Sequence, residues 1–550
     1  MRVRRDTMNL DHFHSRRSPI LARNGMVATS QPLAAMAGLQ ILLAGGNAAD
    51  AAVATAAALN VTEPTSTGLG GDCFALFYNA KTQSVTALNG SGRAPAALTL
   101  DLLARQGFAH ELPPYHAHTI TVPGTCAGWC DLVARHGTMP LRDVLAPAIR
   151  LAEEGFPVAP ITAYFWQRGA ERQLVNSRGG RELTIDGRGP RAGKVMRLPT
   201  LARSLRAVAE GGKEAFYRGE IARKIAATVQ AHGGAMTVED LAAHESTWDE
   251  PISTTYRGVR VWECPPNGQG LATLIALNVL EGFELKGVDP LGAERLHLLI
   301  EAMRVAFADT QWYVADPAFN SIPLDALTSK RYAESRRKLI DPTKAAVDTQ
   351  RGSPVGSSRS DTVYLTAVDG AGNACSFINS NYMGFGTGIV PEGTGISLQN
   401  RGHLFSLDAR HPNALVPRKR PYHTIIPAMA THESDGALYA SFGVMGGFMQ
   451  PQGHIQVVVG MVDDGLDPQA ALDRPRFCLT EANPQSRVEL EVGIPMETLS
   501  RLAQMGHTIV PVAGYARAVF GRGQIIYRDP ESGVLWGGSD PRADGQAVGW

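Results

Sequence analysis

Two hydrophobic periodicities divide the chain into helical and strand-like stretches. Apolar residues recur at helical spacing over 32–46, which ends at paired glycines, and an Ala-rich segment predicts a second helix over 47–60. Short apolar runs at 26–31 and 73–80 predict strands around them. Residues 120–345 are mainly helical in pattern, with a strand-like run at 119–124 and the longest amphipathic helix at 294–314. The pattern predicts helices layered on strands.

The periodicity changes after a polar linker. Residues 343–361 are small and polar, which predicts a mobile segment, as residues 1–24 predict a flexible N-terminal arm. Directly afterwards TVYLTAV alternates, DGAGN supplies a turn and ACSFINS returns, so a hairpin is predicted. Strands follow at 424–431 and 437–444, and helices at 454–465 and 496–506.

Composition excludes several classes of protein. The 550 residues are 44% hydrophobic with a formal net charge of zero, unlike a disordered chain. Neutrality gives no reason to expect nucleic acid or an anionic membrane as partner. Six cysteines are too few for a disulfide scaffold, and no apolar run has the length of a signal peptide or membrane span. These features predict a cytoplasmic protein.

The junction Asp361–Thr362 is the sharpest local feature. A threonine that opens a strand after a flexible linker could be freed as an N-terminal nucleophile by cleavage of the preceding bond. Its α-amine, with a pKa near ~8, could then serve as the base that the hydroxyl needs. Threonine is also a common strand residue, so the junction alone is compatible with a purely structural role.

Two further segments could contribute to such a site. Gly446 and Gly447 follow a predicted strand, where paired glycines let backbone N–H groups approach a reacting carbonyl. His423 and Thr424 stand beside a short basic run and could form a carboxylate-binding corner. Each segment taken alone is equally typical of an ordinary loop.

Other chemistries find less support in the sequence. His116 and His118 form a His-x-His pair, but no set of acidic or histidine residues completes a metal site around them. There is no G-x-S-x-G motif, and GGKEA lacks the Ser or Thr of a phosphate-binding loop. Neither a metal nor another cofactor is therefore expected.

From about Gly25 onward the chain resembles the γ-glutamyltransferase family of N-terminal-nucleophile hydrolases. The resemblance rests on many colinear segments, among them LLAGGNAADAAVA, GLGGDCFAL, EAMRVAFADTQWYVADP, DTVYLTAVDGAGNACSF, GFGTGIV, KRPYHTIIP and VMGGFMQ. It implies a four-layer αββα sandwich of mixed α/β class. It also implies self-cleavage between Asp361 and Thr362. The large piece contains the N-terminal arm and residues 25–361, the small piece is 362–550, and the two stay together as a heterodimer. A dimer of heterodimers is one candidate assembly.

The resemblance also implies roles for individual residues. Thr362 would be the nucleophile for self-cleavage and turnover, Ser380 its supporting hydroxyl, and Gly446 and Gly447 the oxyanion glycines. Substrate-binding roles are implied for Arg93, Asn381, His423 and Thr424.

Departures from the family pattern concern specificity. The acidic residue that holds the substrate α-amino group falls on Leu404, a Ser-Ser pair becomes His423-Thr424, and Arg93 is displaced by two positions. Leucine cannot pair with an ammonium group. DTVYLTAVD, SNYMGFG and MGGFMQPQGH resemble a subgroup that includes oxamate amidohydrolases.

Three functional hypotheses follow. The first is a self-processing threonine amidohydrolase acting on a small carboxylate-bearing amide such as oxamate. The second is a true γ-glutamyltransferase or glutathione hydrolase. The third is a non-processing homologue that binds a ligand without catalysis, because Asp361 replaces the residue usually found before the nucleophile.

Overall fold

Two seven-stranded antiparallel sheets form the centre of the molecule. The computed structural model describes residues 17–346, 361–480 and 486–550. The first sheet has the order β1 (Ile20–Ala22), β18 (Leu535–Ser539), β17 (Arg522–Arg528), β13 (Leu438–Met445), β12 (Ala428–His432), β9 (Val259–Glu263), β8 (Ile252–Tyr256). The second has the order β19 (Gln546–Gly549), β2 (Met26–Thr29), β10 (Asp361–Val368), β11 (Ala374–Tyr382), β3 (Asp72–Asn79), β4 (Ser84–Gly90), β7 (Thr247–Asp249).

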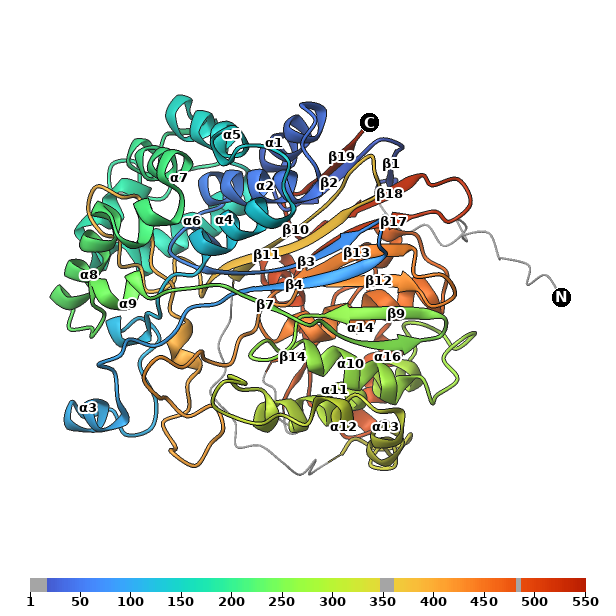
Figure 1. Ribbon diagram of the computed structural model, residues 1–550. Helices are drawn as coiled ribbons and strands as arrows, with labels where there is room; N and C mark the ends of the chain where they lie inside the picture. The colour runs from blue at the N-terminus through green and yellow to red at the C-terminus, as the bar shows by residue number, and fades with distance from the viewer. Residues whose placement is uncertain (1–16, 347–360, 481–485) are drawn as a thin grey trace.

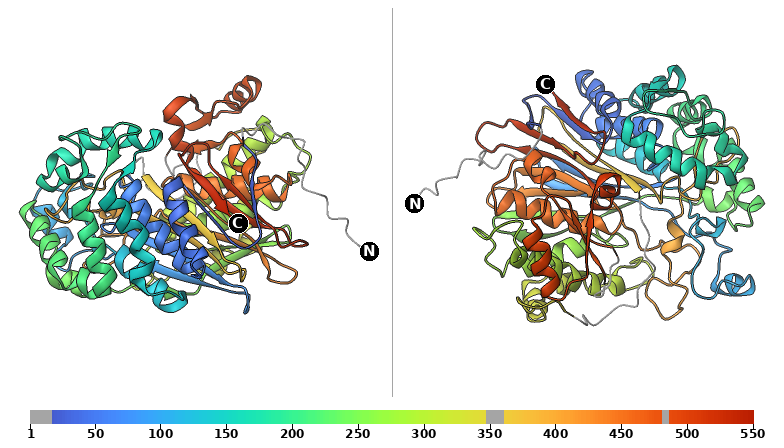
Figure 2. Two further views of the ribbon diagram at one scale, coloured as in Figure 1. Left: turned by 90° about the horizontal axis from the view of Figure 1, so that it is seen from above. Right: turned by 180° about the vertical axis from the view of Figure 1, so that it is seen from behind.

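Helices cover the outer face of each sheet (Figure 1). Those on the side of the second sheet are α1 (Pro32–Leu43), α2 (Ala48–Thr62), α4 (Thr125–His136), α5 (Leu141–Glu154), α6 (Pro160–Arg172), α7 (Pro199–Tyr217), α8 (Glu220–Ala231) and α9 (Val238–Ala242). Those on the side of the first are α10 (Gly270–Leu280), α11 (Ala293–Tyr313), α12 (Leu324–Leu327), α13 (Lys330–Arg337), α14 (Met449–Val462), α15 (Pro468–Asp473) and α16 (Met496–Gln504). Figure 2 shows the same layering from above and from behind. The expected αββα sandwich is confirmed.

Three apolar clusters separate the four layers. One lies between the second sheet and its helices, a second between the first sheet and its helices, and a third between the two sheets. In the third, Tyr364 of β10 packs so closely on Gly443 of β13 that a Cβ on Gly443 would come within 2.6 Å of the Tyr364 ring. The facing sheets are thus in direct contact along β10 and β13, and this contact positions the site described below.

The helix α2 shows how the sequence produces this packing. All 15 of its residues are buried, and small alanine side chains allow close approach to α1, α5 and the sheet. Its N-terminus has a capping box, in which Asn47 accepts from the N–H of Asp50 and Asp50 accepts from the N–H of Asn47. A second capping box begins α9 at Thr237 and Asp240, as the sequence predicts.

Several sequence-based expectations need correction. The long helix α11 is not amphipathic, because 17 of its 21 residues are buried, and it packs on α10, α14, α16 and β14. Residues 119–124 form no strand; a short 3-10 turn at Ala117–Thr119 is followed by an irregular segment that leads into α4. The strand expected over 424–431 begins only at Ala428, after Pro427, which has no N–H for a ladder bond.

The remaining elements lie at the periphery. They are α3 (Leu100–Arg105), the pair β5 (Phe156–Pro157) and β6 (Val195–Met196), and the small sheet β14 (Phe477–Leu479), β15 (Val488–Glu491), β16 (Ile509–Val512). Most of the predicted arm and linker falls outside the described residues, but Ile20–Ala22 of the arm forms the edge strand β1. Among the described helices, none has both the length and the apolar run needed to cross a bilayer.

Candidate active site

The hairpin of β10 and β11 brings two buried hydroxyls together. Thr362 lies at the start of β10, Ser380 near the end of β11, and their Oγ atoms are 3.1 Å apart. The ladder shifts register between Asp361 and Val363, and Tyr382, which pairs with Asp361, has a φ of +78°. A positive φ is strained for an aromatic residue, so the backbone is irregular on both strands at the Asp361–Thr362 bond.

A buried arginine completes this group. Arg401, on the 3-10 turn Arg401–Leu404, donates from Nη2 to Ser380 Oγ (3.2 Å) and from Nη1 to Thr424 Oγ1 (2.7 Å). Ser380 Oγ also accepts from the N–H of Tyr382 (2.9 Å). Because these two bonds use both lone pairs of Ser380 Oγ, a hydrogen bond between the two hydroxyls would have Ser380 donate to Thr362 Oγ1.

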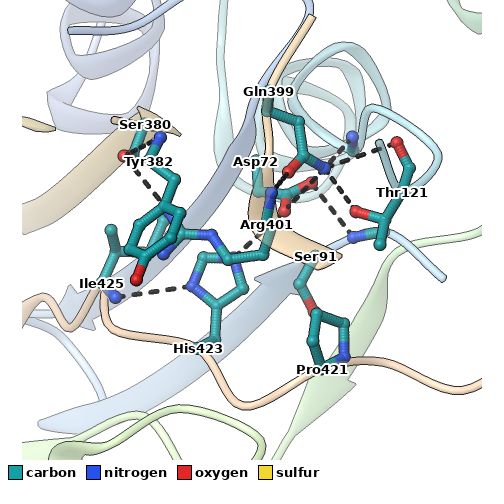
Figure 3. A network of polar contacts seen from close by, with 12 residues as sticks. Asp72, Ser91, Thr121, Ser380, Tyr382, Gln399, Arg401, Pro421, His423 and Ile425 are labelled. Carbon is teal, nitrogen blue, oxygen red and sulfur yellow. Dashed lines mark hydrogen bonds and ion pairs between the residues drawn. The ribbon is translucent and has the colours of Figure 1, made fainter. Parts of the chain in front are cut away.

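Asp72 anchors a second set of contacts beside Arg401 (Figure 3). Its Oδ1 accepts from the N–H groups of Gly92 and Gly124, and its Oδ2 accepts from Gln399 Nε2 and His423 Nε2 at 3.2 and 3.1 Å. The N–H of Ile425 points at His423 Nδ1, which assigns the ring proton to Nε2. Burial lowers the pKa of His423, so the ring is neutral.

Asp72 gives the site a testable pH dependence. Burial raises the pKa of Asp72 to about 7, although Arg401 and the N–H groups of Gly124 and Gly92 act in the opposite direction. An unfolded aspartate titrates near ~3.9, so the folded protein holds this proton to higher pH. The stabilising contribution is fully present below about pH 4 and is lost as pH rises through about 7.

We therefore expect the unfolding free energy of wild type to fall, relative to Asp72→Asn, between about pH 4 and 7. Urea unfolding of both proteins in the same covalent form measures this difference. The exposed Asp101, changed to Asn, is the control and should show no such trend. Parallel pH profiles for wild type and Asp72→Asn would contradict the assignment.

The glycine pair follows the end of β13, on the sheet that faces β10. Thr366 Oγ1 donates to Ser441 Oγ, and Tyr364 packs on Gly443. If this spacing continued for two more residues, it would bring Thr362 toward Met445, just before Gly446-Gly447. The two glycines have φ values of +138° and +62° and precede α14. Neither N–H has a hydrogen-bond acceptor among residues 17–346, 361–480 and 486–550.

Gln269 ties the glycine pair to the arginine group. Its Nε2 donates to the carbonyls of Gly447 (2.8 Å) and Thr424 (2.6 Å), and Thr424 in turn accepts from Arg401. A continuous chain of contacts therefore runs from Gly447 through Gln269, Thr424, Arg401 and Ser380 to Thr362. Two unpaired N–H groups just before a helix can hold the negative oxygen of a tetrahedral intermediate, if the reacting carbon lies beside them.

The other predicted substrate-binding residues occupy different places. Asn381 follows Ser380, donates its N–H to the carbonyl of Ser66, and has a buried Oδ1 without a partner among the described residues. Arg93 is half-buried and donates to the carbonyl of Glu245, beside Arg420. In the described part of the chain no hydrogen bond joins the Arg93 side chain to Thr362, Ser380 or Arg401.

One group of described residues has the composition of a metal site, away from Thr362. His297, Glu301 and His507 place their ligand atoms within 4.8 Å of one another. Part of their hydrogen bonding is met within the protein, because His507 Nε2 contacts His297 Nδ1 (2.8 Å) and Glu301 accepts from the N–H of Ala346. Arg304 also lies 3.5 Å from Glu301, which disfavours a cation there. His116 contacts His118 by ring packing.

The sequence-based reading did not single out Arg401, Asp72 or Gln269. A usable signal existed for two of them. Asp72 is a charged residue at the head of the apolar strand DCFALFYN, and Arg401 is a charged residue in the otherwise uncharged run GISLQNRGHLFSL. A charge inside an apolar or uncharged segment indicates a buried partner or a ligand.

Comparison with known proteins agrees with this geometry. Residues 34–550 match the family model Gamma-glutamyltranspeptidase. The chain is 38% identical to the "Glutathione hydrolase-like YwrD proenzyme" of Bacillus subtilis and 34% identical to the "Oxamate amidohydrolase proenzyme" of Klebsiella pneumoniae, in each case over 96% of this chain and 99% of the relative. The crystal structure of cephalosporin acylase from Bacillus halodurans superposes with a TM-score of 0.91 at 49% identity, covering 100% of this chain and 99% of that one. The chain belongs to the γ-glutamyltranspeptidase family of proenzymes.

Proposed function

We propose that the protein is a self-processing threonine amidohydrolase whose substrate is a small amide carrying a carboxylate, such as oxamate. The observation that carries the proposal is the buried contact of Thr362 with Ser380, which is held in turn by Arg401. Names of relatives support amide chemistry: one is called an oxamate amidohydrolase and others are called acylases.

Self-cleavage would be an acyl shift at the Asp361–Thr362 bond. Thr362 Oγ attacks the carbonyl carbon of Asp361 and gives up its proton, an ester forms, and the C–N bond breaks as the nitrogen takes a proton. Water then hydrolyses the ester and leaves Thr362 with a free α-amine. The register shift at Asp361/Val363 supports this step, because an irregular ladder leaves the bond free to distort.

Turnover would reuse the same hydroxyl. The α-amine of Thr362 takes the hydroxyl proton, Oγ attacks the substrate amide carbon, and the proton passes to the departing nitrogen. Gly446 and Gly447 would hold the negative oxygen of each tetrahedral intermediate, and Ser380 would donate to Thr362 Oγ. Water attacks the acyl-enzyme and releases the acid. The pieces before and after the cleaved bond would stay together, because β10 pairs with β2 inside one sheet.

The proposed specificity is supported by what surrounds Arg401. Leu404, at the end of the same turn, is 2% exposed and packs in the apolar cluster with Tyr382 and Tyr422. No carboxylate is therefore offered there to a substrate ammonium group. The combination favours a substrate with a carboxylate and no α-amine over a γ-glutamyl compound.

The proposal is tested by comparing substrates on one enzyme preparation. We expect ammonia release from oxamate, and much slower release from glutamine, with little turnover of glutathione or γ-glutamyl anilide. Clear turnover of the γ-glutamyl compounds without turnover of oxamate would favour the second hypothesis, a γ-glutamyltransferase or glutathione hydrolase.

A further inference from the structure

The guanidinium of Arg401 is buried, and one of its nitrogens, Nε, has no hydrogen-bond partner among the described residues. Nη1 and Nη2 are bonded to Thr424 and Ser380. One face of the guanidinium lies 4.4 Å from the centre of the Tyr382 ring. A buried, unsatisfied donor on a cation is costly unless a ligand supplies the acceptor.

The positive charge of Arg401 also lacks a direct counter-ion. In the described part of the chain no carboxylate lies within 4.0 Å of it, and Asp72, which acts on it electrostatically, already accepts four hydrogen bonds. Four other buried arginines have such a carboxylate: Arg295 pairs with Asp464, Arg476 with Asp540, Arg522 with Glu63 and Arg542 with Glu491. Arg401 differs from these in needing an anion from outside the protein.

The position of Arg401 limits what the anion can be. Two contacts, of 3.1 and 3.2 Å, separate the hydroxyl of Thr362 from the guanidinium, so the two groups lie no more than about 6 Å apart. A carboxylate held by the guanidinium is then only a few bonds from a carbonyl carbon in reach of Thr362. The substrate is therefore a short molecule. Its carboxylate is bonded directly to the amide carbon or is separated from it by one or two carbons.

We infer that Arg401, rather than Arg93, binds the carboxylate of the substrate, through Nε–H and its charge. The inference rests on the proposed function and deepens it. Arg93 uses its guanidinium on the Glu245 carbonyl, beside the second cation Arg420. Arg401 stands three residues before Leu404, and the family has its acidic residue at the Leu404 position. In this chain the negative charge that would bind a substrate ammonium group is replaced by a nearby positive charge that can bind a carboxylate.

The experiment compares initial rates on two substrates of similar size: oxamate, and its neutral diamide oxamide, in which a second amide replaces the carboxylate. Arg401→Gln also removes the support that Arg401 gives to Ser380, so both substrates should lose rate. We expect kcat/KM for oxamate to fall at least about 30-fold more than that for oxamide, with the additional loss mainly in KM. Arg401→Lys should restore part of the oxamate activity. Arg295→Gln, which removes a buried arginine at another site, is the control for fold damage and should leave the ratio of the two substrates unchanged.

Equal losses on oxamate and oxamide in Arg401→Gln would show a structural role and overturn the inference. A selective loss of oxamate in Arg93→Gln, with none in Arg401→Gln, would overturn it in favour of Arg93. If Arg401→Gln does not fold, Arg401→Lys is compared with wild type on the same two substrates. Lysine keeps the positive charge but lacks the planar guanidinium with its Nε–H donor, so oxamate should lose more activity than oxamide.

Calorimetric titration with oxalate separates this inference from the proposed function. Oxalate carries a carboxylate but no amide, so its binding does not require turnover. Binding to wild type that is lost in Arg401→Gln, with no hydrolysis of either amide, would reject the proposed reaction and keep the anion site. If wild type hydrolyses oxamate but Arg401→Gln still binds oxalate, the proposed reaction is kept and the anion site at Arg401 is rejected.

Discussion

Thr362→Ala should leave the protein as one chain of 58.8 kDa that hydrolyses no amide. The substitution removes the hydroxyl proposed to attack both the Asp361 carbonyl and a substrate, while the methyl group of alanine fits the buried site. Wild type should instead separate on a denaturing gel into pieces of about 39 and about 20 kDa, in proportion to 361 and 189 of 550 residues. Gel and ammonia assay on the same samples measure both effects.

Thr362→Ser is the matched control for this experiment. It keeps a hydroxyl at the same position, so cleavage and turnover should persist at reduced rates. Cleavage of Thr362→Ala at the same bond would contradict the assignment of the nucleophile. A wild-type protein that stays intact after prolonged incubation would support the third hypothesis, a homologue that binds without processing.

Local elements of this fold are readable from the sequence because their causes are local. Asn47 and Asp50 cap α2 with side chains three residues apart, and the turn DGAGN joins β10 to β11 because Asp369 accepts from the N–H groups of Ala371 and Asn373. The hydrophobic periodicity did not predict the burial of a helix that is surrounded by protein on nearly all sides. The helix α11 is buried along most of its length by α10, α14, α16 and β14, so its polar residues do not mark a solvent face.

The site was only partly predictable for a different reason. The glycine pair and Thr362 are marked by residue type, and the family resemblance ordered them. The contacts of Arg401 with Ser380 and Thr424, and of Asp72 with His423, join residues 21 to 351 positions apart through a facing pair of sheets. No local pattern encodes which strands face each other, so these partners became visible only in three dimensions.

Gly446→Ala should reduce kcat by about 100-fold or more and slow self-cleavage as well, because both reactions would use the same oxyanion-binding N–H groups. Alanine rarely adopts a φ of +138°, and its Cβ would lie 3.2 Å from both Gly521 Cα and Met449 Cβ. The backbone must therefore rotate at this residue, and the rotation turns the N–H of Gly447 away from the reacting oxygen. Single-turnover and steady-state rates on oxamate measure the loss.

The control for strain alone is Gly465→Ala. Gly465 also has a positive φ, +65°, but nothing lies within 4 Å of a Cβ placed there, and it follows α14 at the end opposite the glycine pair. Both variants should lose stability by about 1 kcal/mol from the left-handed backbone, so their unfolding midpoints should fall together while only Gly446→Ala loses rate. A comparable loss of kcat in Gly465→Ala would mean that the rate reports global strain. If Gly446→Ala keeps kcat within about 3-fold, the oxyanion must be held elsewhere, since losing one such donor costs far more than that.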